Sequence, residues 1–187
     1  MSIYIHIILL EIKLKGLKMD VKAALSQYGI KSVYHFTDKA NLPTIKKYGL
    51  QSLKNIFNLN IPVKHFGAEE LSHRLDLKRG LDKYVHLSFV QDHPMYHVAK
   101  ARGNIIDPVW IELDISVLFE QKTLFCDKVA NQTNSNLFDA NGVMKFIDFD
   151  SLVYAKDFNT RKEARKAEIL VHDFIGADKI KGIYNGK

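Results

Sequence analysis

The chain has 187 residues, 47% of them hydrophobic and 26% charged, which is the size and composition of an ordinary globular domain. Its 27 Lys and Arg against 21 Asp and Glu give a formal net charge of +6, which favours an anionic partner, nucleic acid first; a basic surface that serves only solubility is the alternative. Cys126 is the single cysteine, which excludes an internal disulfide and a cysteine-based zinc site and indicates a reducing, cytoplasmic compartment.

The first predicted element is a short strand in the apolar run IYIHIILL, residues 3–10. This run is too short to span a bilayer, and it lacks the flanking basic residue and the small-residue cleavage site of a secretory signal. No membrane association is therefore expected. A second methionine, Met19, opens a new amphipathic segment. We interpret residues 1–18 as a possible N-terminal extension and residues 19–187 as one domain.

Helices and strands follow one another irregularly along the rest of the chain. Apolar spacing, capping residues and terminal glycines predict helices over residues 19–30, 41–50, 93–103 and 157–166. Alternating side chains and β-branched residues predict strands over residues 32–36, 83–89, 108–115, 122–126, 167–172 and 179–185. The predicted loops are residues 52–82, with room for one short helix, and the polar residues 127–142. This order favours an α+β fold over a doubly wound parallel sheet.

The sequence holds no glycine-rich phosphate-binding loop and no His-Glu-x-x-His motif. His93 and His97 are four positions apart on a predicted helix, a spacing that suits a metal, but no third ligand is evident nearby. The sequence therefore predicts no metal site.

Two predicted strands carry polar side chains that packing does not require. In VYHFT, His35 and Thr37 are two positions apart and point to the same face, where they could hold a ribose or an amide; a core histidine satisfied by backbone groups is the alternative. In YVHLSF, Ser88 lies at the strand end beside Phe89, an arrangement that suits a flat heterocycle; a surface serine is the alternative.

A carboxylate begins a third strand. Glu168 stands in RKAEILVHDF, shortly after Arg165 and Lys166. One interpretation is a surface ion pair at the end of a strand. The other is a catalytic carboxylate at the edge of a cleft that binds an anionic ligand.

Several sequence blocks together resemble a known family. VYHFTDKANLPTIKKYGL, LSHRLD, YVHLSF with HPM, and RKAEILV occur in that order between Val33 and Val171. They resemble the ADP-ribosyltransferase superfamily, and closely the DarT family of DNA ADP-ribosyltransferase toxins. The resemblance implies an α+β fold with a split, mixed β-sheet, flanking helices and a cleft for NAD.

The resemblance also implies roles for individual residues. NAD is the expected co-substrate, without a metal. Four residues are expected to contact NAD. His35 is expected at the adenosine-side ribose, Thr37 at the nicotinamide end and Arg74 at the phosphates. Ser88 stands near a second-strand position that varies within the superfamily. Arg79 competes with Arg74 for the phosphate contact. Glu168 is the expected catalytic acid, with Arg74 as a second catalytic residue.

The implied activity is transfer of ADP-ribose from NAD to a base of single-stranded DNA, with release of nicotinamide. Cleavage of the nicotinamide bond builds positive charge on the ribose, which a fixed carboxylate stabilises. Arg165 and Lys166 are expected to bind the nucleic acid and to keep Glu168 ionised. Phe138 and Phe149 are expected to stack on bases, with packing onto the core as the alternative.

Two other readings of function stay open from the sequence. One is the same chemistry with RNA or protein as the acceptor, and the other is a basic nucleic-acid-binding domain without catalysis. The resemblance further implies an antitoxin partner with macrodomain-type ADP-ribosyl-hydrolase activity. Which base is modified does not follow from the residues.

Overall fold

The computed structural model describes residues 21–186, so the strand expected in residues 3–10 and the boundary between residues 18 and 19 lie outside the described residues. Residues 21–27 are helical, within the predicted helix. Val21, Ala24 and Leu25 bury the apolar face of this helix against the sheet.

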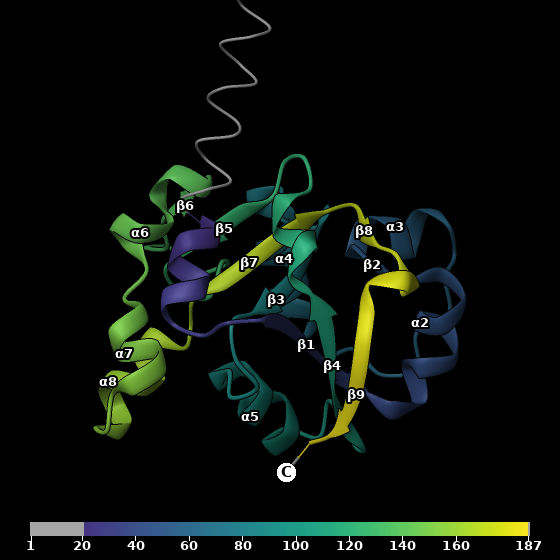
Figure 1. Ribbon diagram of the computed structural model, residues 1–187. Coiled ribbons are helices and arrows are strands. Elements are labelled where there is room, and N and C mark those ends of the chain that lie inside the picture. Colours follow the sequence, from purple (N-terminus) through teal and green to yellow (C-terminus); the bar gives the residue numbers. More distant parts are fainter. Residues whose placement is uncertain (1–20, 187) are drawn as a thin grey trace, which may run out of the picture.

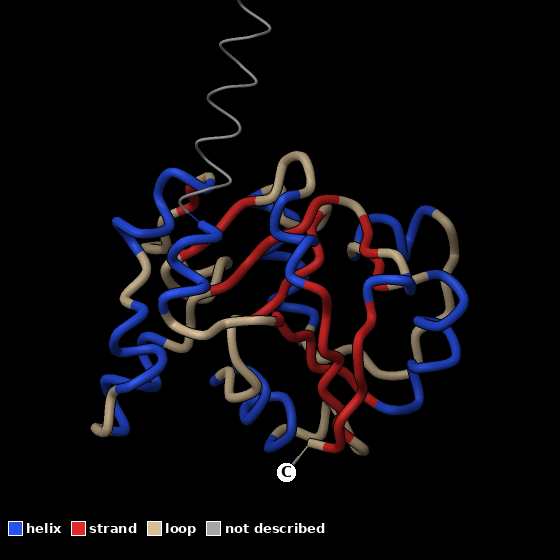
Figure 2. The backbone as a smooth tube through the Cα atoms, viewed as in Figure 1, coloured by secondary structure: helices blue, strands red, loops and turns tan. Residues whose placement is uncertain are grey.

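Seven strands form the main sheet, and two more form a separate ribbon (Figures 1 and 2). The order across the main sheet is β6-β5-β7-β3-β1-β4-β9. The strands are β1 (Ser32–Asp38), β2 (Leu50–Gln51), β3 (Tyr84–Ser88), β4 (Pro108–Asp114), β5 (Leu124–Cys126), β6 (Leu137–Phe138), β7 (Glu168–His172), β8 (Phe174–Ile175) and β9 (Ile180–Asn185). The α+β class is confirmed. A mixed sheet was expected, but every strand pair of the described sheets is antiparallel.

The main sheet divides between β1 and β3. All seven residues of β1 pair with β4, and all five residues of β3 pair with β7. β1 and β3 share only the pair Tyr34–Ser88 and are not paired with each other beyond it. The sheet is thus split into a half formed by β9, β4 and β1 and a half formed by β3, β7, β5 and β6.

Short helices surround the sheet. They are α2 (Leu42–Tyr48), α3 (Leu53–Asn58), α4 (Glu70–Arg79), α5 (Pro94–Ala101), α6 (Val143–Phe146), α7 (Phe149–Tyr154) and α8 (Phe158–Ala164). α6, α7 and α8 lie near the β6 end of the sheet, whereas α2 and α3 lie near the β2–β8 ribbon (Figure 1). α2, α5 and α8 fall within predicted helices.

The predicted loop of residues 52–82 is wrong in part, because it contains both α3 and the ten-residue α4. α4 has an unusual distribution of side chains. Ser72, His73 and Asp76 line a cavity, whereas Leu71 and Leu75 are exposed. Because its inward face is polar, α4 lacks the apolar stripe that identifies a surface helix. The segment 127–142 contains the short β6, and α6 and α7 follow it without a matching prediction.

The main core lies between the sheet and the helices at the β6 end. Val33, Leu87, Ile111 and Ile169 of the sheet pack in one cluster with residues of the N-terminal helix, and Phe149 belongs to the same cluster. Strands buried in this way keep their ends in fixed positions, so side chains at those ends are held precisely enough for chemistry.

Candidate active site

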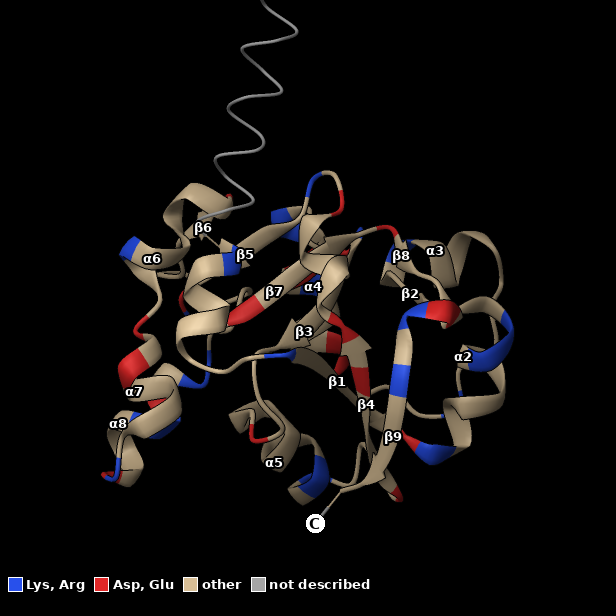
Figure 3. Cartoon of the chain, viewed as in Figure 1, with Lys and Arg blue, Asp and Glu red and all other residues tan. Residues whose placement is uncertain are grey.

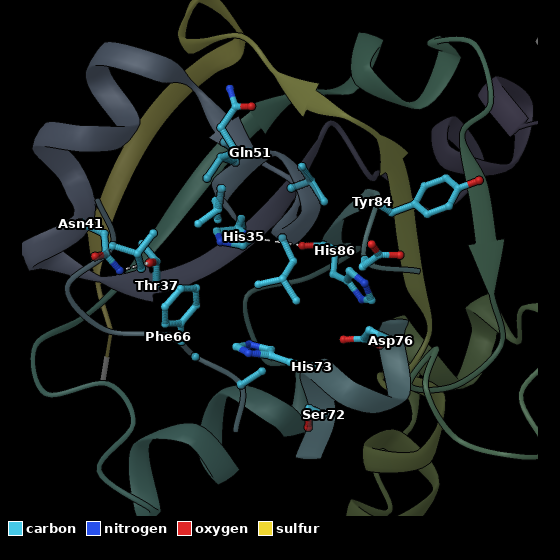
Figure 4. Close-up of a pocket in the computed structure, with 18 of the residues that line it drawn as sticks. His35, Thr37, Asn41, Gln51, Phe66, Ser72, His73, Asp76, Tyr84 and His86 are labelled. Carbon is cyan, nitrogen blue, oxygen red and sulfur yellow. Dashed lines mark hydrogen bonds between the residues drawn. The ribbon is translucent and has the colours of Figure 1, made fainter. Parts of the chain in front are cut away.

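A cavity of about 260 Å³ lies where β1 and β3 are no longer paired (Figure 4). Both strands line it, together with α4, the start of β7 and the segment 61–68. Polar side chains from four elements therefore face one space. They are His35 and Thr37 of β1, His86 of β3, Asp76 of α4 and Glu168 of β7.

The β1 wall of the cavity carries two of the predicted NAD contacts. His35 Nδ1 lies 3.0 Å from the carbonyl oxygen of His86. A carbonyl only accepts hydrogen bonds, so Nδ1 carries the proton. Burial lowers the pKa of His35, with a smaller opposing contribution from that hydrogen bond. The ring is therefore neutral near pH 7, and its Nε2 is left as an acceptor suited to a ribose hydroxyl.

Thr37 is held at the same wall by Asn41. Asn41 Nδ2 donates to Thr37 Oγ1 at 3.1 Å and to the His65 carbonyl at 2.7 Å, and Asn41 Oδ1 accepts from the Lys64 N–H at 2.8 Å. Asn41 stands at the predicted cap position of α2, but its side chain makes no capping bond there. It instead fastens the end of β1 to the segment that closes one side of the cavity.

Glu168 is the first residue of β7 and is only 6% exposed. Its Oε2 accepts from His86 Nδ1 and from the Ala130 N–H, each at 3.1 Å. Its Oε1 lies 3.6 Å from His93 Nε2. Burial opposes ionisation, but the His86 hydrogen bond, the two histidines and the Ala130 N–H together hold the pKa of Glu168 below its ordinary value. The carboxylate is therefore both charged and fixed in position.

His86 is the central residue of the site. Its carbonyl accepts from His35, and its ring donates to Glu168, so one residue of β3 connects the two walls of the cavity. Burial works against the cation, but the hydrogen bond and charge of Glu168, with the charge of Asp76, raise the pKa of His86. His86 and Glu168 thus form an ion pair in which Glu168 is buried and His86 is partly exposed.

His93 lies beside the other oxygen of Glu168, and its Nε2 has no hydrogen-bond partner among the described residues. It caps α5, where its Nδ1 accepts from the Met95 N–H at 3.2 Å. Burial lowers the pKa of His93, although the charge of Glu168 opposes this. In the neutral ring the proton must then lie on Nε2, which faces Glu168 Oε1.

The two candidate arginines of α4 lie in different surroundings. Arg74 is exposed and does not line the cavity, so its contact with the NAD phosphates stays a prediction. Arg79 points towards the 127–142 segment. Its Nη1 donates to the Ala130 carbonyl at 2.5 Å, to Ser135 Oγ at 2.6 Å and to the Gln132 carbonyl. Arg79 therefore fixes the loop whose Ala130 N–H holds Glu168.

Ser88 lies beside the site but does not line the cavity. It pairs with Tyr34 on one side and with Glu168 on the other. Its hydroxyl donates to the Val90 carbonyl at 2.8 Å. This geometry favours a structural serine at the junction of the two halves of the sheet, and a contact with NAD stays a prediction.

The basic residues before β7 are engaged with neighbouring groups. Arg165 pairs with Asp92 and donates through Nε to the Leu152 carbonyl at 3.0 Å, and Lys166 pairs with Glu163 at 2.6 Å. The histidines and a backbone N–H therefore lower the pKa of Glu168. The expectation that Arg165 and Lys166 keep it ionised is wrong. Lys and Arg occur on α2, α5, α8 and β9, and of these four elements only α8 also carries an acidic residue (Figure 3).

The two phenylalanines that were expected to stack on bases differ in exposure. Phe149 is 3% exposed and stacks on Tyr28 with ring centroids 5.2 Å apart, so it packs in the core, and its expected role in stacking is wrong. Phe138 is partly buried between Phe125 and Phe146, and base stacking by Phe138 stays a prediction.

Sequence reasoning missed His86, Ala130 and Asp76, and it considered His93 only as a possible metal ligand. His86 is two positions before Ser88 on the same strand, so alternation could have placed the two on one face. Ala130 acts through its backbone N–H, which no side-chain pattern reveals.

The two histidines that suggested a metal by their spacing face different partners. His93 faces Glu168, whereas His97 Nε2 lies 2.7 Å from Asp92 Oδ1. Within residues 21–186, no group of three or more His, Cys, Asp or Glu is arranged to hold a metal ion. In the same part of the chain, no helix has the length and apolar character needed to cross a membrane.

A family model described as "ssDNA thymidine ADP-ribosyltransferase, DarT" matches residues 34–186. Thermus sp. 2.9 DarT with ADP-ribosylated ssDNA superimposes with a TM-score of 0.65 at 18% identity, over 83% of this chain and 81% of that chain. Its complex with NAD+ gives 0.62 and 17%, over 82% and 81%. Thermosipho africanus DarTG with ADP-ribose gives 0.68 and 20%, over 84% of this chain and 44% of that one. No curated protein matches. At these identities the structural likeness shows a common fold.

Proposed function

This chain belongs to the DarT family, and we propose that it transfers ADP-ribose from NAD to the thymine base of single-stranded DNA, with release of nicotinamide. The family description names thymidine, the nucleoside whose base is thymine, whereas composition and motifs left the base open. The observation that carries the proposal is the setting of Glu168. A buried carboxylate, held by His86 and the Ala130 N–H, faces the same cavity as His35 and Thr37.

The arrangement suits the chemistry of the transfer. As the nicotinamide bond breaks, the ribose gains oxocarbenium-like positive charge, and a fixed, ionised carboxylate lowers the energy of that state. Glu168 is fixed before the substrate arrives, because its donors come from β3 and from the loop that Arg79 holds. The Nε2 atom of His35 can accept from a ribose hydroxyl, and Thr37 offers a hydroxyl beside it. The two β1 side chains thus bind, and Glu168 stabilises charge.

The expected partners follow from this reaction. Single-stranded DNA suits a site that acts on a base edge, because a duplex base must first leave its stack. A hydrolase of the macrodomain type would remove the ADP-ribose mark and act as the antitoxin, and one of the similar solved structures is a DarTG protein with ADP-ribose. We place the reaction in the cytoplasm, where Cys126, a free and buried thiol, stays reduced.

The test is incubation of the full chain with NAD and a series of oligonucleotides, followed by mass spectrometry. The expected result is a mass gain of one ADP-ribose on single-stranded DNA that contains thymine, and no gain on oligonucleotides without it. A parallel series of RNA strands and proteins tests the other acceptors. Binding of oligonucleotides without consumption of NAD would contradict the proposal and favour a non-catalytic domain.

A further inference from the structure

Asp76 is a partly buried carboxylate to which the reaction above assigns no role. It lies on the cavity face of α4, next to His86 (Figure 4). Its Oδ1 atom is buried and has no hydrogen-bond partner among the described residues. A buried polar atom without a partner is rare in folded proteins and requires an explanation.

Transfer to a thymine base releases one proton. The ring N–H bond breaks, the nitrogen forms a new bond to C1′ of the ribose, and the electrons of the old C1′–N bond leave with nicotinamide, which departs as a neutral molecule. The ring nitrogen is a weak nucleophile while it keeps its proton. The site therefore needs a base within reach of the acceptor.

Glu168 is poorly suited to accept that proton. Its Oε2 already accepts two hydrogen bonds, and its Oε1 faces His93. The same contacts hold the pKa of Glu168 below its ordinary value, which favours charge stabilisation and weakens the carboxylate as a base.

We infer that Asp76 is the general base that takes the proton from the thymine ring nitrogen, while Glu168 stabilises the charge on the ribose. This inference rests on the proposed function. The two carboxylates line one cavity from different elements, α4 and β7, and the charge of each acts on the His86 ring. Such a division assigns the acceptor base and the ribose carbon to two groups of different task.

The surroundings of Asp76 fit this role. Burial raises the pKa of Asp76, the charge of His86 opposes the rise, and the charges of Glu168 and Asp82 add to it, with Asn131 as a hydrogen-bonding neighbour. A carboxylate with a higher pKa is a stronger base. Asp76 and Glu168 thus have pKa values shifted in opposite directions, which is a pattern of paired acid–base groups.

The experiment uses Asp76→Asn in the full chain, which keeps the size of the side chain and removes its basic form. Transfer from NAD to a thymine-containing oligonucleotide should fall about 100-fold, the scale of one general base. Affinity for NAD should stay within about twofold, because the lost group acts on the acceptor. Glu70→Gln, an exposed carboxylate on the same helix, is the matched control and should leave the rate unchanged.

Two further readouts separate a base from a structural carboxylate. The wild-type rate should fall as pH is lowered through the raised pKa of Asp76, because protonation removes the base. In Asp76→Asn this pH dependence should be absent. In Asp76→Ala, added formate should restore the rate at least about tenfold, because a small carboxylate can occupy the emptied space. Formate should not affect Glu70→Gln.

The outcomes separate this inference from the proposed function. If the wild type modifies no oligonucleotide, the proposed function fails. If the wild type is active and Asp76→Asn stays within about threefold of it, Asp76 is not the base, and the proposed function stands. The inference would also be overturned by an Asp76→Ala variant that circular dichroism shows to be folded, but that is inactive and does not respond to formate.

Discussion

The half of the main sheet that ends in β1 and the half that begins with β3 present different chemistry to the cavity. β1 offers Thr37 and the neutral ring of His35, which suit hydroxyl and amide groups. The other half offers the ion pair of His86 and Glu168. The halves share only the residue pair Tyr34–Ser88, so the groups that bind and the groups that carry charge stand on different parts of the sheet. We therefore expect that substitutions can alter NAD binding and charge stabilisation independently.

The largest expected effect comes from removing the charge on the β7 side. Glu168→Gln keeps the size of the side chain and should lower transfer by roughly 100-fold or more, because the oxocarbenium-like state loses its stabilising charge. NAD and DNA binding should stay near normal, since β1 is unchanged. Transfer assays and separate binding titrations check this. Glu163→Gln, an exposed carboxylate of α8, is the control. Near-normal turnover of Glu168→Gln would remove the catalytic role of this residue.

A change in α4 should act on the same half without touching the ribose. Arg79→Ala frees the loop that carries Ala130, so the rate should fall about tenfold through the loss of one ordered hydrogen bond to Glu168. KM for NAD should change little, and Arg79→Lys should restore the rate only in part, because it lacks the planar fork. A changed KM with an unchanged rate would mean that Arg79 serves the phosphates instead.

Arg74→Ala tests the competing assignment. If Arg74 contacts the NAD phosphates, as the family resemblance implies, the exposed side chain must reach the bound co-substrate, and KM for NAD should rise by roughly tenfold, the scale of a charge-assisted hydrogen bond. Initial rates measured against NAD concentration give this value. An unchanged KM would contradict the assignment.

The binding half should respond in the opposite sense. His35→Ala removes the ring that faces the cavity, so NAD affinity should fall up to about tenfold, the worth of one hydrogen bond. The rate at saturating NAD should fall less. Calorimetric titration and thermal melts check this, with the melting temperature expected within a few degrees of wild type. A large loss of stability with unchanged affinity would favour a purely structural histidine.

The smallest expected effect is a pH dependence of stability. The pKa of Glu168 is below its unfolded value of 4.5, so its contribution is present above pH 4.5 and is lost as pH falls through the folded pKa. The pKa of His86 is above 6.5, so its contribution is present below pH 6.5 and is lost as pH rises through the folded pKa. Denaturant unfolding across this range should show both losses in the wild type. Glu168→Gln should lack the loss at low pH and show a smaller loss at high pH, because the charge of Asp76 still raises the pKa of His86.

The sequence predicts the parts of the fold whose side chains follow a simple period. β3, β4 and β7 each lie within a predicted strand, and β1 begins with its predicted strand at Ser32 but extends two residues beyond it, to Asp38. The sequence pattern does not predict α4, because its leucines are exposed and its polar residues face the cavity. The single pair between β1 and β3, which creates the cavity, leaves no mark on the pattern of either strand.

The site divides in the same way. His35, Thr37 and Glu168 stand in recognisable blocks, and all three line the cavity. The groups that tune them come from elsewhere: His86 from the middle of β3, the Ala130 N–H from a polar loop, and Arg79 from α4. These contacts join residues 38 or more positions apart, so only the folded chain brings them together. Asp76 lies in a segment expected to be mostly loop, which concealed it.

The single residue pair between β1 and β3, Tyr34–Ser88, bears on how such a chain can change over evolutionary time. Beyond that pair, β1 and β3 are not paired with each other, and residues of both strands line the cavity. The peptide unit is the same in every residue, so a wall built partly of backbone tolerates replacement of many neighbouring side chains. A shared fold at 17–20% identity is what this tolerance permits.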